Sequence, residues 1–248
     1  MKYTLTDLHT HILPAMDDGA ENLESAIQML RREKAGGVER VALTPHFYPQ
    51  RESLEEFLNR RDSVFSALQK AWREEEMPCL RLGAEVRYTP ALLDMDLHRL
   101  TIGQSNYLLL ELSDTEVPAY IERVLDGIFL QGITPILAHV ERCVYFRREP
   151  DNLRKLIQMG ALAQISGKAL KNREDRNFSR LCLEKGLAHI IASDAHHPDK
   201  DGGLGDIAKI LNEELMERAE EFAKAVWDNE CPPAFSIDSV KKGLLGYR

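Results

Sequence analysis

The chain has 248 residues, of which 44% are hydrophobic and 29% are charged, as is usual for a globular protein. Its net charge of -8 argues against a broad nucleic-acid interface, because binding to a phosphate backbone needs clustered Lys and Arg. No apolar run approaches the ~18 residues that span a membrane, and the N-terminus lacks the apolar core of a signal peptide. We therefore expect a cytoplasmic protein without membrane insertion.

The chain shows no linker, internal repeat or low-complexity tract, so we predict a single domain over residues 1–248. Its four cysteines form no Cys-x-x-Cys pair and are predicted to be reduced packing thiols. They are Cys79, Cys143, Cys182 and Cys231.

Seven short apolar runs have the composition of strands that are buried on both faces, the kind found in parallel sheets. Six of the seven end in His, Asp or Glu, and the carboxyl ends of parallel strands are where active sites lie. The runs cover residues 4–9, 40–46, 79–85, 107–112, 133–139, 161–166 and 188–196.

Between these runs, apolar residues recur three and four positions apart, which predicts amphipathic helices near residues 26–30, 54–72 and 117–128. Ser53 and Glu56 form a capping box that marks the start of the second of these helices. Glycines that precede the next strand mark several helix ends. They are Gly36, Gly37, Gly132, Gly160 and Gly186.

Seven strand and helix units in 248 residues are typical of a parallel α/β barrel. An open doubly wound sheet is the rival fold, but it usually binds ligands at one switch point, whereas here candidate ligands follow nearly every strand. We therefore predict a seven-stranded TIM-like (β/α)7 barrel. A last helix near residues 211–227 is apolar on one face, which fits packing against the barrel or against a partner.

The first run ends in Asp7, His9 and His11 at alternate positions, which places two imidazoles on the same face of a strand. Neutral imidazoles suit Zn, Mn, Fe or Ni, and Asp7 is placed to orient one of them. The turn at residues 17–19 either caps the following helix or contributes Asp18 to the same site.

The later strand exits supply further candidate ligands. Glu111 ends an apolar run, where a carboxylate is costly unless a metal ion or an arginine compensates it, and we favour the metal. His46 alone is more often a structural residue than a ligand. The coincidence of such residues at the strand exits nevertheless indicates a metal centre. The remaining candidates are Glu85, His139, Asp194 and His196.

Together these segments resemble the motifs of the polymerase and histidinol phosphatase (PHP) superfamily. They are most similar to its bacterial protein-tyrosine phosphatase branch, the CpsB/CapC type, from about residue 5 to about residue 230. The most branch-specific part is the Asp-Asp-Gly turn at residues 17–19 together with His-Val-Glu-Arg at residues 139–142. The resemblance implies a distorted seven-stranded barrel, the PHP fold, with three divalent metal ions.

The resemblance also implies how the ligands are divided among the three metals. Manganese is the expected metal, and Fe, Co or Zn are alternatives, because the donors are imidazoles and carboxylates without thiolates. The first set is His9, His11, Glu85 and Asp194; the second is Glu85, Glu111 and His139; the third is Asp18, His46 and His196.

Arg142 matches the phosphate-binding arginine of the family. A second family arginine is absent, and Lys200 could replace it as a point charge but not as a bidentate partner. We expect a metal-bound hydroxide as the nucleophile, with His46 or His196 protonating the leaving oxygen. No cysteine has an arginine six positions later, so the loop of thiol phosphatases is missing.

Aromatic residues follow several strand exits, where they could hold a phenyl ring or simply pack the loops. The resemblance implies a phosphotyrosine protein substrate, a bacterial tyrosine kinase, in capsule or exopolysaccharide regulation. The alternatives are a PHP phosphatase of a small ester such as histidinol phosphate, a nuclease acting on a nucleic-acid end, and a non-catalytic regulatory module. The aromatic residues are Phe47, Tyr48, Tyr88, Tyr145 and Phe146, of which Tyr48 and Tyr88 are predicted to bind substrate.

Overall fold

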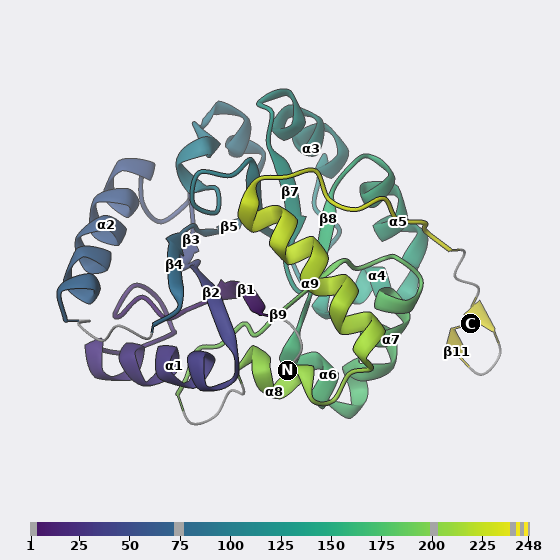
Figure 1. Cartoon of the computed structure of the whole chain (residues 1–248). Coiled ribbons are helices and arrows are strands. Elements are labelled where there is room, and N and C mark those ends of the chain that lie inside the picture. The colour runs from purple at the N-terminus through teal and green to yellow at the C-terminus, as the bar shows by residue number, and fades with distance from the viewer. Residues whose placement is uncertain (1–3, 72–76, 199–202, 239–241, 244–245, 248) are drawn as a thin grey trace.

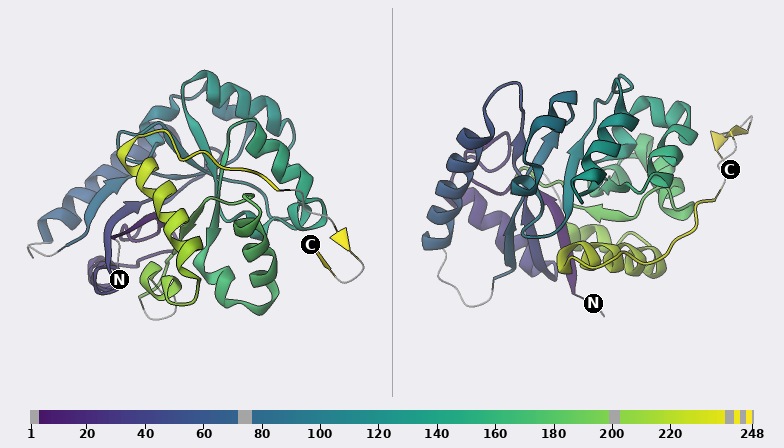
Figure 2. Two further views of the ribbon diagram at one scale, coloured as in Figure 1. Left: turned by 45° about the vertical axis from the view of Figure 1, so that its right-hand side comes forward. Right: turned by 90° about the horizontal axis from the view of Figure 1, so that it is seen from above.

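The computed structural model describes residues 4–71, 77–198, 203–238, 242–243 and 246–247. Its parallel strands curl about a common centre, and helices cover the outside (Figures 1 and 2). None of the helices in these ranges combines the length and the apolar character that crossing a membrane requires.

Two parallel sheets form the curled surface, with strand orders β1-β2-β4 and β3-β5-β6-β7-β8-β9. All seven predicted runs contain strands, which confirms the parallel α/β prediction. The strands are β1 Leu5–Thr10, β2 Val38–Leu43, β3 His46–Phe47, β4 Cys79–Leu82, β5 Glu85–Arg87, β6 Tyr107–Glu111, β7 Thr134–Leu137, β8 Leu162–Ser166 and β9 Ile190–Ala192. A separate antiparallel hairpin joins β10 Lys242–Gly243 to β11 Gly246–Tyr247.

The second and third runs are kinked, so each forms two short strands instead of one. The kink between β2 and β3 contains Pro45, which has no N–H to donate to a ladder, and the kink between β4 and β5 contains Gly83. At the other junction, Thr10 forms a bridge with Ala195, and the His11 N–H donates to the Ala195 carbonyl at 2.9 Å. The two sheets therefore meet on both sides of the curled surface.

The helices lie near the predicted positions, although α3 (Ile121–Leu130) begins after Val117 and Tyr120 of the predicted segment. The capping box is confirmed, because the Ser53 N–H donates to Glu56 Oε2 at 2.9 Å and the Glu56 N–H to Ser53 Oγ at 3.3 Å. The helices are α1 Leu23–Ala35, α2 Leu54–Ala71, α3 Ile121–Leu130, α4 Val144–Arg148, α5 Pro150–Gln158, α6 Gly167–Lys171, α7 Arg173–Glu184, α8 Leu204–Ala208 and α9 Glu213–Asp228, with 3-10 turns η1 Pro90–Asp94, η2 Leu97–Leu100 and η3 Val140–Arg142.

Helix α9 lies across the amino-terminal ends of β1 and β9 (Figure 1). Its buried Phe222 and Trp227 join Leu8, Leu109 and Ile136 in a hydrophobic cluster inside the curled sheet. The apolar face of this helix is therefore used in packing against the strands. The carboxyl ends of the strands are left open at the opposite end.

Candidate metal centre

Glu85 lies at the centre of a group of histidines. Its side chain is 1% exposed, and its Oε2 lies 3.2 Å from His9 Nε2, 3.3 Å from His11 Nε2 and 2.9 Å from His46 Nδ1. His139 Nε2 lies 2.8 Å from Oε1. Oε2 makes no hydrogen bond although three ring nitrogens face it. Buried polar atoms are almost always paired, so this convergence of donor atoms is the arrangement expected of metal ligands.

Three of the imidazoles are held at Nδ1 by an oxygen atom, which leaves Nε2 facing the centre. Metal-ligating histidines are usually oriented in this way. The Nε2 atoms of His9 and His11 are only 3.1 Å apart, and their lone pairs repel unless a proton or a cation lies between them. The Nδ1 contacts are His9 to Gln164 Oε1 at 3.2 Å, His11 to Asp17 Oδ2 at 2.7 Å and His196 to the Asp194 carbonyl at 2.9 Å.

Asp17 orients the imidazole of His11. The sequence suggested Asp7 for this role at His9 or His11. Burial acts to raise the pKa of Asp17, but hydrogen bonds from His11, the His46 N–H and the Gly19 N–H lower it well below its usual range. Asp7 instead accepts main-chain hydrogen bonds, including one from Ser193 at 3.1 Å.

The turn at residues 17–19 serves the site and does not cap α1. The cap of that helix is Asn22, whose Oδ1 accepts from the Ser25 N–H at 3.0 Å, so the capping interpretation of this turn is wrong. A Cβ atom at Gly19 would collide with the His11 carbonyl oxygen, and only glycine lets the chain pass so close.

Two further carboxylates are each held by an arginine. Arg87 Nη1 lies 3.0 Å from Glu111 Oε1, and Glu111 Oε2 has no hydrogen-bond partner. Arg142 Nη2 donates to Asp194 Oδ2, while Asp194 Oδ1 lies 3.6 Å from His9 Nε2. Each carboxylate thus keeps one oxygen directed toward the cluster. The role of Arg87 was not predicted from the sequence.

The charged groups of the cluster stabilise one another in their ionised forms. Burial acts to raise the pKa of Glu85, but the surrounding imidazoles, His9 first, lower it well below its usual range. Burial acts to lower the pKa of Arg142, but the carboxylates of Asp194 and Glu141 outweigh it and raise that pKa. Glu85 is therefore an anion and Arg142 a permanent cation at neutral pH.

Cys143 lies near the strand exits but has the wrong protonation state for a nucleophile. Burial raises the pKa of its thiol to about 12, so the thiolate is not populated at neutral pH. The geometry therefore offers no thiol mechanism at this position.

Three groups of side chains have ligand atoms that lie within 4.8 Å of one another. These groups contain seven of the nine predicted ligands, and the other two, Asp194 and His139, lie beside His9 and Glu85. The residues in these groups differ in part from the three ligand sets that the family resemblance implies. His11 joins the group around Asp18, and His46 takes the place of His139 beside Glu111. The groups are His11, Asp18, His46 and His196; His9, His11 and Glu85; and His46, Glu85 and Glu111.

Two of the candidate ligands have left-handed backbone conformations, with φ of 30° at His139 and 53° at Asp194. Positive φ is uncommon for residues other than glycine, and such strain is concentrated at functional sites. These turns direct both side chains back toward the cluster at the carboxyl ends of β7 and β9.

The predicted aromatic residues divide into two classes. Tyr48 and Tyr88 are half-buried near the cluster, and the Tyr48 ring lies 5.1 Å from that of His46. The other three are buried and pack with neighbouring rings, so their role is structural. They are Phe47, which packs on Phe57 at 4.8 Å, and Tyr145 and Phe146, whose ring centroids are 4.6 Å apart.

Lys200 lies outside the described residues. Among the described cations, Lys168 on α6 also reaches the cluster, with Nζ 3.3 Å from His196 Nδ1. The position of Lys168 two residues after the end of β8 could have identified it, since that run ends in Ser166 instead of an ionisable ligand.

A family model described as "Capsular polysaccharide synthesis, CpsB/CapC" matches residues 5–222, a range that contains every one of these site residues. The chain belongs to the CpsB/CapC family.

Two relatives of this chain carry phosphatase names. The chain is 32% identical over 203 residues to tyrosine-protein phosphatase YwqE of Bacillus subtilis, which covers 78% of each chain. It is 30% identical over 213 residues to tyrosine-protein phosphatase CpsB of Streptococcus pneumoniae, covering 79% of this chain and 84% of that protein.

The fold is also shared with a solved structure from work on YwqE of Bacillus subtilis and CpsB of Streptococcus pneumoniae, described there as unique metal-dependent tyrosine phosphatases. That structure matches 96% of this chain and 100% of its own chain, with a TM-score of 0.83 and 27% sequence identity.

Proposed function

We propose that this chain is a metal-dependent protein-tyrosine phosphatase, formed by one domain over residues 1–248 with the distorted seven-stranded barrel of the PHP fold. The observation that carries the proposal is the buried carboxylate of Glu85, which faces four imidazoles and has an oxygen without a hydrogen bond. The names and the metal dependence of the relatives support the same activity.

The donor set fits divalent metal ions, since imidazoles and carboxylates converge without a thiolate. We propose three ions, with manganese first and Fe, Co or Zn as alternatives. When bound, such ions attract phosphate oxygens and make a water molecule a stronger nucleophile at neutral pH. The residues that would hold them are His9, His11, Asp18, His46, Glu85, Glu111, His139, Asp194 and His196.

Arg142 and Arg87 would have different roles in the site. Arg142 has a 38% exposed side chain beside Asp194, so it can pair with a phosphate group as well as with that carboxylate. Arg87 would hold Glu111 in its ligand orientation. Tyr48 and Tyr88 would contact the phenyl ring of the substrate.

His46, or a water molecule that it positions, would protonate the leaving oxygen through a ring nitrogen that does not bind metal, and the pKa of His196 argues against that residue as the donor. Burial and the neighbouring His11 lower the pKa of His196 to about 4, so its imidazole is neutral and suited to metal binding. The physiological substrate would be a phosphotyrosine protein, a bacterial tyrosine kinase of the cytoplasm in capsule or exopolysaccharide regulation. Lys200 remains a proposed second contact for the phosphate.

Turnover of three substrates by one metal-loaded sample tests this proposal. We expect a phosphotyrosine peptide to be hydrolysed faster than histidinol phosphate and a 3'-tailed oligonucleotide to be left intact, with all activity lost to a strong chelator. Preference for histidinol phosphate would identify a small-ester phosphatase. Inactivity toward all three substrates would favour a regulatory module, and activity in metal-free protein would refute the mechanism.

A further inference from the structure

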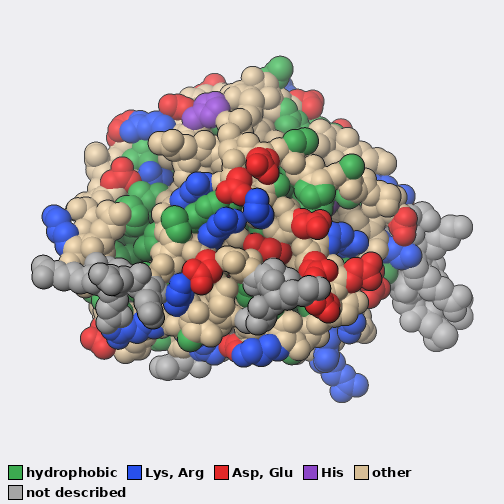
Figure 3. Space-filling view, in the orientation of Figure 1, with side chains coloured by type: hydrophobic (Ala, Val, Ile, Leu, Met, Phe, Trp, Pro, Cys, Tyr) green, Lys and Arg blue, Asp and Glu red, His purple; other side chains and the backbone are tan. Residues whose placement is uncertain are grey.

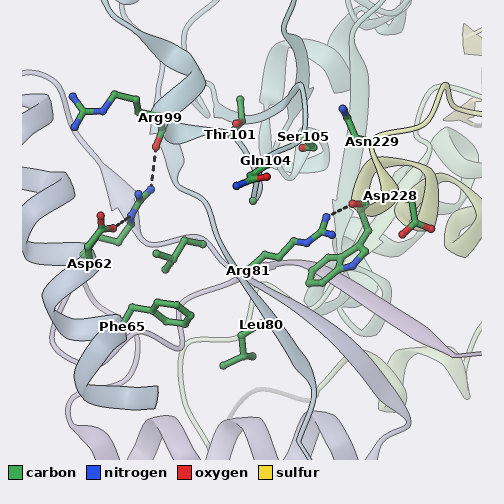
Figure 4. A pocket seen from close by; sticks show the side chains of 14 residues that line it. Asp62, Phe65, Leu80, Arg81, Arg99, Thr101, Gln104, Ser105, Asp228 and Asn229 are labelled. Carbon is green, nitrogen blue, oxygen red and sulfur yellow. Dashed lines mark hydrogen bonds and ion pairs between the residues drawn. The ribbon is translucent and has the colours of Figure 1, made fainter. Parts of the chain in front are cut away.

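A cavity of about 500 Å³ lies outside the metal centre, bounded by α2, β4, the segment before β6 and the end of α9 (Figure 4). Only the 3-10 turns η1 and η2 lie between the kinked β4–β5 strand and β6, so no α-helix of that unit covers the outer face of β4. The volume is within the range of small-molecule sites, roughly 300–1,000 Å³.

The cavity has an apolar side and a polar side. Phe65 and Leu80 lie on one side, Thr101 and Gln104 lie on the other, and the side chain of Arg81 extends toward the end of α9 (Figure 4). This division suits a small molecule that carries a charged group and an apolar part.

Arg61 is a buried cation in the wall of this cavity, with an exposed fraction of 7%. Its Nη1 donates to the carbonyls of Gly83 and Arg99 at 3.2 Å each. The carboxylate paired with its Nε is Asp62 at 3.0 Å, which is 59% exposed and therefore screened by water. A buried charge is costly without a buried partner, so an anion in the cavity would stabilise Arg61.

Arg81 is the second cation in the cavity wall. It donates to the Trp227 carbonyl and lies 4.3 Å over the indole ring, and within the described ranges no carboxylate oxygen lies within 4.0 Å of it. Figure 3 shows Lys and Arg side chains grouped near the middle of this face, beside a hydrophobic patch.

Positive charge exceeds negative charge around the cavity although the chain carries a net charge of -8. The charged residues that line the cavity are three arginines and two carboxylates, which leaves one positive charge in excess. They are Arg61, Arg81 and Arg99 against Asp62 and Asp228.

We propose that this cavity is a binding site for a small organic phosphate, with Arg81 contacting the phosphate, Arg61 supplying positive charge from the cavity wall, and Phe65 and Leu80 contacting the organic part. A phosphate monoester offers three terminal oxygens to guanidinium donors, whereas a carboxylate offers two. Guanidinium groups also bind phosphate oxygens in a bidentate manner. The site is separate from the proposed catalytic centre and does not depend on it.

Trp227 provides a local signal for binding, because it lines the cavity and the only other tryptophan of the sequence is Trp72. In a Trp72→Phe background we expect a saturable change in Trp227 fluorescence with inorganic phosphate. Phenylphosphonate, which is not hydrolysed, should bind more tightly because its ring reaches the apolar side of the cavity.

Three variants test the assignment. Arg81→Leu should raise the dissociation constant at least about tenfold, since a charged hydrogen bond contributes about 1.5 kcal/mol or more. Gln104→Glu adds a negative charge at an exposed cavity residue that makes no side-chain hydrogen bond within the described part of the chain, and should also weaken binding. Gln158→Glu makes the same change on α5 and should have no effect, and Arg142→Ala should also retain the fluorescence change.

The fluorescence response and the phosphatase activity should be separable. Arg81→Leu and Gln104→Glu are expected to hydrolyse phosphotyrosine peptide at the rate of the unmodified protein. An absent fluorescence response, or an equal response in Gln104→Glu and Gln158→Glu, would overturn the phosphate site. Phenylphosphonate binding no tighter than inorganic phosphate would overturn the organic part of the proposal.

Discussion

Arg142 and Arg87 make similar contacts with carboxylates of the metal centre. Each donates to one oxygen of a carboxylate, Asp194 or Glu111, whose other oxygen is directed toward the imidazoles. Arg142 is the proposed phosphate contact and Arg87 the proposed positioning residue for Glu111, so we expect the two arginines to differ in function.

Arg142→Ala should lower kcat for a phosphotyrosine peptide by about 100 to 1,000-fold, because a donor to transition-state charge is lost. Arg142→Lys should recover only part of this loss, since an ammonium group keeps the charge without the planar fork. Kinetics and metal content should be measured on the same samples. Near-normal turnover in the alanine variant, with folding intact, would make Arg142 a structural residue.

Arg87→Met should weaken metal binding by about 10 to 100-fold, the usual effect of removing a residue that orients a ligand. The reason is that Glu111 loses its partner at Oε1 and becomes free to rotate. Titration of metal into the apo-protein measures this directly, with Arg123→Met on the exposed face of α3 as the control. Equal metal affinity in both variants would contradict the positioning role.

The sequence predicted the candidate ligands because all but Asp18 lie at or near the end of an apolar run, a relation visible along the chain. It did not predict Arg87 or Gln164, because their roles depend on contacts across the fold. Gln164 meets His9 although 155 positions separate them, and no local pattern marks such a pair. The burial of Tyr145 could not be predicted from the sequence either, because an aromatic residue in a loop can pack inward or line a site.

At the scale of elements, composition predicted the strands and periodicity predicted the helices. The kinks at Pro45 and Gly83 could not be placed with certainty, because a run of apolar residues has the same appearance whether its strand is straight or broken. Likewise, the apolar face of α9 was visible, but only the fold shows that it closes the amino-terminal end of the curled sheet.

Helix α9 carries a buried carboxylate that makes its packing sensitive to pH. Glu220 accepts hydrogen bonds from the Thr6 N–H at 2.8 Å and Thr6 Oγ1 at 2.7 Å, and burial raises its pKa from 4.5 to about 7. The folded state therefore binds this proton more tightly than the unfolded state. The resulting stabilisation is full below about pH 4.5 and is lost as the pH rises to about 7.

Glu220→Gln should remove this dependence while retaining an acceptor for Thr6. Relative to the unmodified protein, the variant should gain up to about 3 kcal/mol between pH 4.5 and pH 7.5, at 1.36 kcal/mol for each pKa unit. Urea denaturation across this range measures the difference, with Glu221→Gln at an exposed neighbouring position as the control. A difference that does not vary with pH would show that Glu220 does not titrate in this range.

At the scale of the whole molecule, the metal centre joins parts of the chain that are far apart in sequence. The candidate ligands extend from His9 after the start of β1 to His196 beyond β9, and Glu85 contacts residues from both sheets. An unfolded chain cannot present these residues together, so metal binding and folding should be linked.

The last prediction follows from this linkage. A metal that binds only the folded state at 100 times its dissociation constant adds about 2.7 kcal/mol of stability. For a chain of this size, each kcal/mol raises Tm by about 2–4 °C, so loading with Mn should raise Tm by roughly 5–10 °C. Calorimetry at increasing Mn concentration should show a continuing rise in the unmodified protein and little rise in Glu85→Ala, which lacks the carboxylate shared by the histidines. Equal shifts in the two proteins would mean that the ions bind elsewhere, and phosphatase activity would then need a different metal site.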